Sequence, residues 1–442
     1  MLDINSIFTE YDDSLVKSIN TDPLGFQVVW TYFGQKIFHN KTTSIALDIR
    51  SYNINLFNQF IIYQILKNEN GLSFDQLIPT QNNDTKFKIE KALVVLENLL
   101  TWSWFVTKDN DQWKEDEKRG LLGTSKALTI WKDNPSEYQI NLTETNWKKI
   151  EILTNQRSLG VSGRYKGPFK AMKFFEEYTE NSYKNSIVFE KVKPLIMAEN
   201  SPFNHLYIEV MNFLKVYQNN KSYSVTQDND LVDAFIITFK NPQYTASYTH
   251  VFWLEQLGLK DNEAKTLYEK VELNTGNKSE VQSVKDVFKK SYQDLNNSKI
   301  FQDIFQIEPQ LTYLDILFEY VMQQHHDKKS IDDLDKKYLE PLKDFTWDNL
   351  DLQNHSSTKA RIEKLAGIKD YQSLIKYHIE IMQKRERFPW VELKDDNTIK
   401  INVFQKIDTK KLEEQLSKKW NINEWVNDYY ISSIRSIKQG LS

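Results

Sequence analysis

The chain contains no cysteine, and this absence excludes several kinds of site. Without thiols there are no disulfides, no thiolate zinc or iron–sulfur centres and no cysteine nucleophile. Long apolar runs are also missing: stretches such as Phe60-Ile61-Ile62 are short, whereas a bilayer requires roughly 20 apolar residues. The first residues, MLDINSIFTE, carry acids where a secretory leader carries bases. We therefore expect a cytoplasmic protein without a membrane segment.

Arginine is scarce, with eight among the 57 basic residues. The richness in lysine, asparagine and isoleucine indicates an AT-rich bacterial genome, in which arginine is rare by composition. An arginine in this chain therefore weakly indicates a position that needs a planar, bidentate donor. The formal net charge is −4. A surface that binds nucleic acid throughout would be basic, so any such contact must be local.

Hydrophobic residues make up 40% of the 442 residues and aromatic residues 13%, which is ample for packed cores. At roughly 150 residues per domain, this length predicts two or three domains. Apolar residues recur mostly at helical spacing, so we predict a mainly α, multi-domain protein. The predicted divisions are an N-terminal helical region (1–145) containing a winged-helix-like module (about 54–140), a central helical domain (146–326) and a C-terminal α+β region (327–442) with a β-hairpin at 390–404.

The winged-helix prediction rests on the order of elements between residues 53 and 107. Helical patterns cover 53–68, 73–77 and a stretch from about Thr85, and the alternation from Trp102 to Thr107 is typical of a strand. In a winged helix-turn-helix the third helix can present bases to a DNA groove. Here those bases are Lys86, Lys88 and Lys91. Winged-helix folds also serve as protein–protein modules, and the sequence leaves both uses open.

The most unusual local sequence is LGVSGRYKGPF at 159–169, which holds three of the chain's twelve glycines. Residues 152–175 carry five bases and no acid. Glycines allow backbone N–H groups to approach an anion, and neighbouring arginine and lysine add charge-assisted hydrogen bonds. We therefore predict a loop that contacts nucleic acid or another anion. The alternative is an interdomain turn with solvated bases. The candidate residues are Arg157, Gly160, Gly163, Arg164, Lys166, Gly167, Lys170 and Lys173.

Known phosphate and nucleophile motifs do not fit this glycine-rich segment. It lacks the Walker A and Rossmann spacings, and Arg164 stands where a nucleophile elbow around Ser162 requires glycine. The Gly160–Gly163 spacing resembles the backbone clamp of KH modules, a pattern that also occurs by chance.

Other groups point only weakly to chemistry. Glu392 and Lys394 on the predicted hairpin form half of a metal-dependent nuclease signature, which an ordinary surface strand also produces. The run from His325 to Asp335 reads as a solvated linker rather than a metal cluster. His378 shares a helical face with apolar residues, so we expect a core histidine with satisfied hydrogen bonds.

These observations favour a non-enzymatic binding subunit of a multi-protein cytoplasmic assembly, without cofactor or metal. Its partners would be other protein subunits, with DNA or RNA as further candidates and no membrane. A bacterial genome-maintenance or phage-defence complex is the setting that we expect. The competing hypothesis is a metal-dependent nuclease, or another enzyme whose site is not visible in the sequence.

Overall fold

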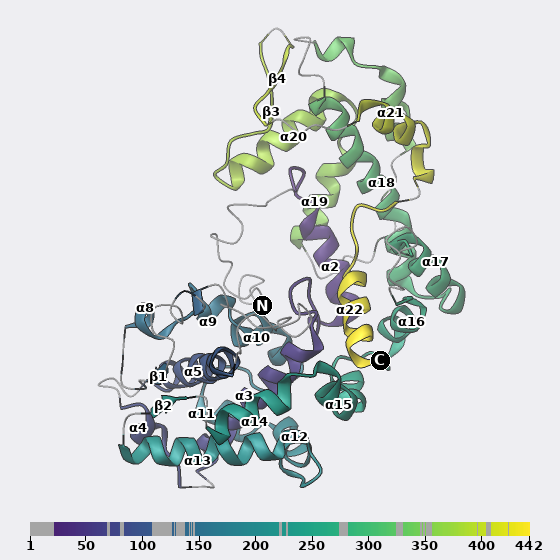
Figure 1. The fold of residues 1–442 in the computed structure, drawn as a ribbon. Helices are drawn as coiled ribbons and strands as arrows, with labels where there is room; N and C mark the ends of the chain where they lie inside the picture. The colour runs from purple at the N-terminus through teal and green to yellow at the C-terminus, as the bar shows by residue number, and fades with distance from the viewer. Residues whose placement is uncertain are drawn as a thin grey trace. The chain divides into compact units, whose positions relative to one another are not determined.

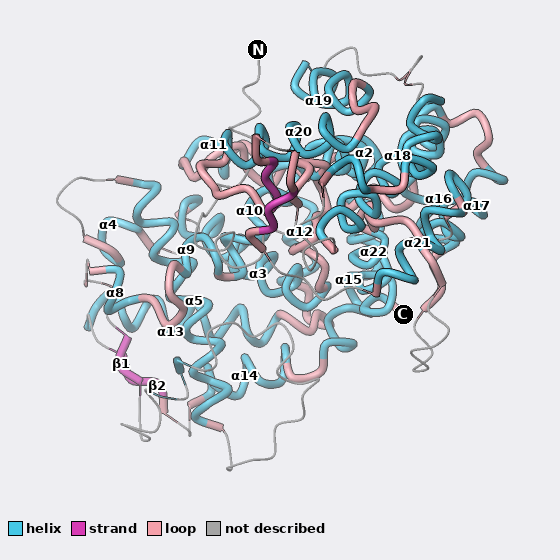
Figure 2. Tube along the Cα trace, turned by 90° about the horizontal axis from the view of Figure 1, so that it is seen from above, coloured by secondary structure: helices cyan, strands magenta, loops and turns pink. Residues whose placement is uncertain are grey.

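A computed structural model describes most of the chain. The described residues are 22–68, 71–79, 84–107, 126, 127, 129, 138–140, 142, 144, 146–220, 223–226, 229–273, 282–323, 330–344, 347, 350, 356–395, 397–403, 408–422 and 424–442. They are mainly helical, as predicted, and their strands form two two-stranded sheets (Figure 2). None of the described helices has the length and apolarity needed to cross a membrane.

The chain divides into two compact units, each discontinuous in sequence. The described part of the first unit belongs to Asn40–Lys260 and Ser432–Ser442. Its elements are α3 (Ile49–Lys67), α4 (Phe74–Leu77), α5 (Thr85–Val106), β1 (Tyr138–Ile140), α8 (Trp147–Ile150), α9 (Gln156–Leu159), α10 (Val161–Ala171), α11 (Glu180–Lys184), α12 (Ile187–Met197), α13 (Asn204–Asn220), β2 (Tyr223–Val225), α14 (Asp230–Phe239), α15 (Pro242–Gln256) and nearly all of α22 (Ile431–Leu441).

The second unit comprises Asp261–Ile431 together with described residues 22–39. Its helices are α2 (Gln27–Phe38), α16 (Asn262–Lys270), α17 (Val284–Asp294), α18 (Lys299–Met322), α19 (Ser356–Ala366), α20 (Tyr371–Lys384) and α21 (Thr409–Ser417), with 3₁₀ turns η4 (Ile331–Asp333), η5 (Lys336–Asp344) and η6 (Lys419–Asn421). Strands β3 (Val391–Leu393) and β4 (Ile399–Ile401) form the hairpin predicted at 390–404. The three consecutive domains proposed from the sequence remain a prediction.

Helix α3 is the centre of the first unit, where α5, α10, α11, α12 and α15 pack around it (Figure 1). The Asp48 side chain caps its start by accepting from the Arg50 N–H, and Asn68 ends it in the left-handed conformation at φ 55°. Every residue from Ile49 to Leu66 is buried, although six of them are arginine, asparagine or glutamine. A helix buried on all sides needs internal partners for such groups.

Neighbouring helices supply several of those partners. On α15, Trp253 Nε1 and Thr249 Oγ1 donate to Asn53 Oδ1 at 2.7 and 3.0 Å. On α11, the Tyr183 hydroxyl donates to Gln59 Oε1 at 2.6 Å. These bonds fix the rotation of α3 and the register of the helices around it.

In the second unit, α18 is the longest helix and its buried face contacts α2, α20 and α21. His378 on α20 is fully buried, as predicted for a core histidine. Its Nδ1 lies 2.8 Å from the Pro23 carbonyl oxygen, and its Nε2 accepts from the Trp390 N–H at 2.8 Å. The ring is therefore neutral, with the proton on Nδ1.

Two local predictions were wrong. Trp102 to Val106, predicted as a strand, is the last part of α5. The glycine-rich segment at 159–169, predicted as a loop, forms the end of α9 and most of α10. Elsewhere in the first unit, β2 pairs with β1 in antiparallel register, with Gln139 opposite Ser224.

Candidate functional site

The glycine-rich segment folds as a helix because its glycines permit close packing. A Cβ at Gly163 would lie 2.4 Å from the Arg157 carbonyl oxygen, so only glycine lets α10 approach α9 this closely. Gly160 precedes α10 in an extended conformation, and a Cβ there would lie 2.4 Å from a carboxylate oxygen of Glu97. Both glycines are buried.

Glu97, on α5, occupies the N-terminal end of α10. Its Oε1 accepts from the Ser162 N–H at 2.7 Å, and its Oε2 accepts from Gln156 Nε2 at 3.1 Å. Burial raises the pKa of Glu97, while these hydrogen bonds lower it. An internal carboxylate thus serves as the anion at this helix end. The glycines provide packing for that arrangement, and any external anion must meet the side chains of α10.

The outer side of α10 carries cations and no acid. Arg164, Lys166 and Lys170 are each half-buried, and half-buried Gly167 lies between them in sequence. The Lys166 ammonium sits 4.5 Å from the centre of the Tyr178 ring. Among the described residues, Arg164 and Lys170 have no ion-pair partner. Lys173, just beyond the helix, is exposed and adopts φ 67°.

Arg157, on α9, extends this basic surface and is already held in place. Its Nε lies 3.3 Å from Glu151 Oε1, and its guanidinium lies 4.3 Å from the centre of the Trp147 ring. Trp147 meets Phe87 edge-on with ring centres 5.2 Å apart. The Arg157 guanidinium therefore stacks on an aromatic ring. Arg157, Glu151, Trp147 and Phe87 all belong to the first unit.

The three lysines proposed for the recognition helix have different environments. Lys86 is exposed and lies 4.0 Å from Glu90. Lys88 is buried and pairs with Asp75, and buried Lys91 donates to the carbonyl oxygens of Leu142 and Glu144. Burial lowers the pKa of Lys91 to about 8. Of the three, only Lys86 is exposed to solvent.

Glu90 brings the two predicted groups of bases together. Burial raises its pKa, and the charges of Lys166, Lys86 and Arg157 lower it. These three cations come from α10, α5 and α9, so the two separate stretches identified in sequence meet around one carboxylate. Sequence reasoning missed Glu90, Glu97 and Trp147. The Lys86–Glu90 spacing of four residues was the one local signal for any of them.

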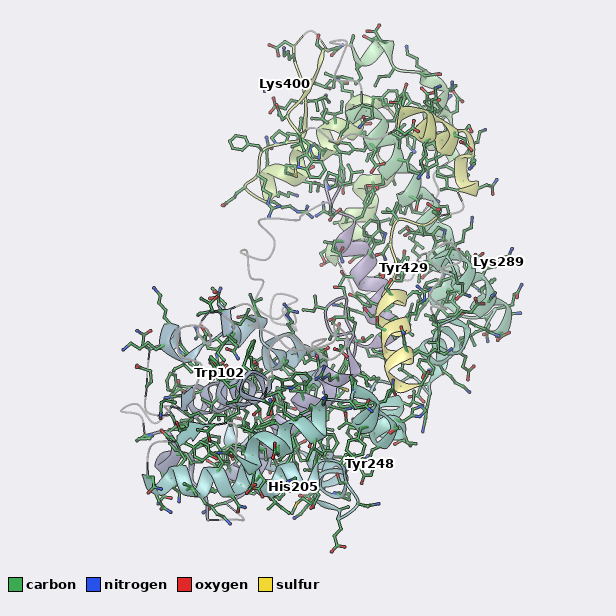
Figure 3. All side chains as sticks on the ribbon, viewed as in Figure 1. Trp102, His205, Tyr248, Lys289, Lys400 and Tyr429 are labelled. Atoms are coloured by element: carbon green, nitrogen blue, oxygen red, sulfur yellow. The ribbon has the colours of Figure 1, made fainter. Side chains whose placement is uncertain are left out.

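The residues considered for metal chemistry do not form a metal site in the described part of the chain. Glu392 pairs across the hairpin with Lys400, which is labelled in Figure 3, at 3.0 Å. No group of three or more histidine, aspartate or glutamate side chains with metal-binding geometry occurs among the described residues. His325, His326 and Asp327 lie outside them.

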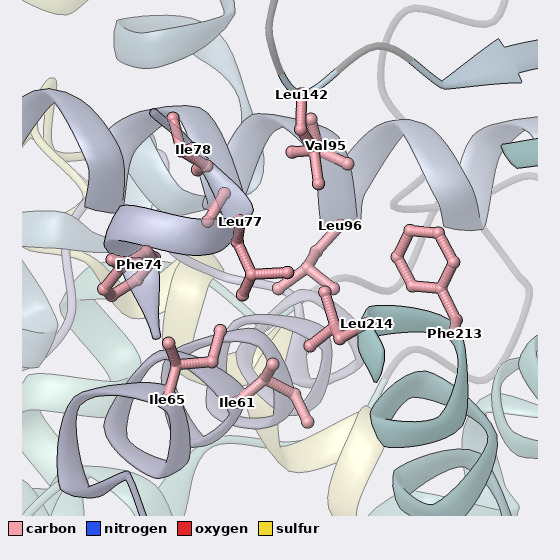
Figure 4. A pocket seen from close by; sticks show the side chains of 11 residues that line it. Ile61, Ile65, Phe74, Leu77, Ile78, Val95, Leu96, Leu142, Phe213 and Leu214 are labelled. Atoms are coloured by element: carbon pink, nitrogen blue, oxygen red, sulfur yellow. The ribbon is translucent and has the colours of Figure 1, made fainter. Parts of the chain in front are cut away.

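A small void lies between α3, α4, α5 and α13 (Figure 4). Its volume is about 10 Å³, and it is lined by Ile61, Ile65, Phe74, Leu77, Ile78, Ala92, Val95, Leu96, Leu142, Phe213 and Leu214. It is barely large enough for one water molecule and offers no polar partner, so it is a packing defect rather than a ligand site.

Comparison with protein-family models, curated proteins and solved structures finds no match to this chain.

Proposed function

We propose that this chain is a non-enzymatic binding subunit that contacts nucleic acid or a partner protein through the basic surface of its first unit. The basic surface comprises Lys86, Arg157, Arg164, Lys166 and Lys170. The observation that supports this function is the sequence of α10, which carries three cations and no acid of its own, with Glu90 of α5 facing Lys166. In a chain of net charge −4, such a concentration of positive charge favours an anionic partner.

Nucleic acid is the partner that the chemistry of this surface favours. Flexible lysine and planar arginine side chains suit phosphate oxygens. The Trp147–Arg157 stack adds an aromatic ring to the basic surface, and nucleobases can stack on such a ring. An acidic protein surface could satisfy the same cations. A bacterial genome-maintenance or phage-defence assembly would supply either partner.

The winged-helix-like module at about 54–140 forms part of the proposal. Helices α3, α4 and α5 supply the order helix, short helix, helix, and residues 108–125, which would include the wing, lie outside the described residues. Helix α5 is buried continuously from Ala92 to Val106. We therefore place the contact on α10 and the first turn of α5, where Lys86 is exposed, rather than along α5.

Charge reversal provides the test. Arg164 and Lys170 are suited to substitution because neither has a described ion-pair partner whose loss would destabilise the fold. The variant Arg164→Glu/Lys170→Glu should weaken binding to labelled single- or double-stranded DNA or RNA at least tenfold. It should also lower the slope of log affinity against log salt by about two, one for each lost phosphate contact.

The matched control is Lys191→Glu/Lys215→Glu, which makes the same change in net charge at exposed positions of the same unit. It should leave affinity within about twofold. Equal weakening by both pairs would mean that net charge, not the basic surface, attracts nucleic acid. If no nucleic acid binds but an acidic peptide does, the partner is a protein. Magnesium-dependent cleavage that disappears in Glu392→Ala would support the nuclease alternative instead.

A further inference from the structure

The second unit contains a buried carboxylate that joins two distant segments of the chain. Glu308, on α18, is fully buried. Its Oε2 accepts from Trp30 Nε1 at 2.9 Å and from the Tyr429 hydroxyl at 2.6 Å. Its Oε1 accepts from Thr312 Oγ1 at 3.2 Å and from the Asn427 N–H at 3.3 Å. All four bonds are donated to Glu308, as a carboxylate requires.

These donors come from the segments through which the chain passes to the first unit. Trp30 lies on α2, which ends at Phe38, and the chain enters the first unit at Asn40. Residues 424–430, here called the C-terminal strap, lead into α22, and the chain re-enters the first unit at Ser432. Tyr429 lies just before α22 (Figure 3).

A second set of contacts joins the strap to α2 directly. The Tyr430 ring packs against Gly34 so closely that a Cβ there would lie 2.6 Å from a ring carbon. The Phe38 and Tyr430 ring centres are 6.2 Å apart, and Thr31 forms a hydrogen bond with the Tyr430 side chain. Thr31, Gly34 and Phe38 are three and four residues apart and so share one side of α2.

The strap is held in a conformation that its residue types disfavour. Tyr429 and Tyr430 have φ values of 46° and 62°, in the left-handed region that bulky residues rarely adopt. Two such residues in succession persist only where their surroundings fix them. The bond from Tyr429 to Glu308 and the seat of Tyr430 on Gly34 are the contacts that fix them here.

We propose that five residues form a conformational latch, which couples the local opening of α2 to the local opening of the C-terminal strap. They are Glu308, Trp30, Thr312, Asn427 and Tyr429. When the latch is closed, the strained turn at Tyr429–Tyr430 is maintained and Trp425 packs against Phe288 and Phe305, with ring centres 5.4 and 5.3 Å away. Loss of the carboxylate allows the turn to relax and releases the strap. This device does not depend on the basic surface of the first unit.

Hydrogen–deuterium exchange of the full chain tests the latch. In Glu308→Gln, the side-chain NH₂ group would face groups that themselves donate hydrogen bonds, so the latch should be lost. Backbone amide exchange should therefore accelerate at least tenfold in both α2 and the strap. The β3–β4 hairpin should be unchanged. Glu319→Gln, a half-buried position on the same helix, is the control and should leave both segments protected.

Two milder variants separate a latch from a simple loss of stability. Tyr429→Phe should accelerate exchange in α2 as well as in the strap, and Trp30→Phe should accelerate exchange in the strap as well as in α2, because coupling is reciprocal. The proposal would be overturned if Tyr429→Phe accelerated exchange only in the strap and Trp30→Phe accelerated it only in α2. Uniform acceleration throughout the second unit would equally overturn it, since Glu308 would then be an ordinary core group. If Glu308→Gln does not fold, these two variants still decide the question.

Discussion

The carboxylate of Glu97 accepts a hydrogen bond of 2.7 Å from the backbone N–H of Ser162, so a residue of α5 caps a helix that begins 64 residues later in the chain. Glu97→Ala should lower the free energy of unfolding by about 2–4 kcal/mol, because it leaves a buried N–H unpaired and opens a cavity. Glu97→Gln keeps an acceptor and should cost about half as much. Urea denaturation measures both losses.

Glu177→Ala provides the comparison for Glu97, because Glu177 is exposed. Its effect should stay within about 0.5 kcal/mol. If Glu97→Ala costs no more than this control, the carboxylate is not holding α10 in place, and the amide groups at its start would be available to another anion.

Gly163→Ala tests the packing role of the glycines. The added Cβ would lie 2.4 Å from the Arg157 carbonyl oxygen and 2.5 Å from the Ser158 carbonyl carbon, which are backbone atoms that cannot rotate away. We expect a loss of about 3 kcal/mol in unfolding free energy from overpacking between α9 and α10. Gly71→Ala is the contrasting variant. It has open space around the new Cβ and only a positive φ of 70°, so it should cost about 1 kcal/mol. Equal losses would contradict the packing explanation.

The error at the end of α5 shows how polar helices mislead sequence patterns. Thr101 and Ser103 alternate with Trp102 and Trp104 as in a strand, and Thr107 ends the segment. In the structure their hydroxyls donate to the carbonyls of Glu97, Leu99 and Ser103, four residues earlier. Each hydroxyl is satisfied by the helix itself, so Thr101 and Ser103 can be buried. The twofold alternation in TWSW at 101–104 was therefore real but did not reflect two faces of a strand.

The lysine and arginine residues of the candidate site could be predicted from the sequence, but the acidic residues near them could not. The cations of α9 and α10 stand out because they cluster in sequence, and Lys86 follows a recognisable helix start. Glu90 meets Lys166 and Arg157 only through tertiary packing. Glu97 accepts from the Ser162 N–H across 65 residues, and a pairing of that separation leaves no local pattern. His378 was predictable because its own helical face is apolar, which is a local property.

Lys91 and Lys86 lie on the same helix and should respond differently to substitution. Lys91→Met removes two hydrogen bonds to backbone carbonyl groups, one of them fully buried, and should cost about 1–3 kcal/mol of stability. Lys86→Met, at an exposed position, should change stability by no more than about 0.5 kcal/mol. In a nucleic-acid titration we expect the reverse order, with Lys86→Met weakening binding and Lys91→Met leaving it unchanged. Loss of binding in a stably folded Lys91→Met variant would show that α5 contacts the ligand through its buried side.

His378 should make stability depend on pH in the mildly acidic range. Burial lowers its pKa to about 4, and the nearby positive charge of Arg385 also lowers it, while the Pro23 carbonyl opposes the shift. Asp22, which pairs with Arg385 at 3.0 Å, is the acid on the adjoining segment. In the unfolded chain the imidazole takes up a proton near pH 6.5. Between about pH 6.5 and 4 the unfolded state therefore binds more protons than the folded state.

The contribution of His378 is thus complete above about pH 6.5 and declines as the pH falls toward 4. Between pH 7.5 and 5 the loss should be about 2 kcal/mol. His378→Gln can still donate to Pro23 and accept from Trp390 but cannot be protonated. It should be somewhat less stable than the wild type at pH 7.5 and nearly equal to it at pH 5. Urea denaturation across this range measures the difference between the two proteins, which cancels the titration of other groups. Exposed His205→Gln should keep the wild-type pH dependence. A constant gap between wild type and His378→Gln at all pH values would mean that the histidine is not held neutral in the core.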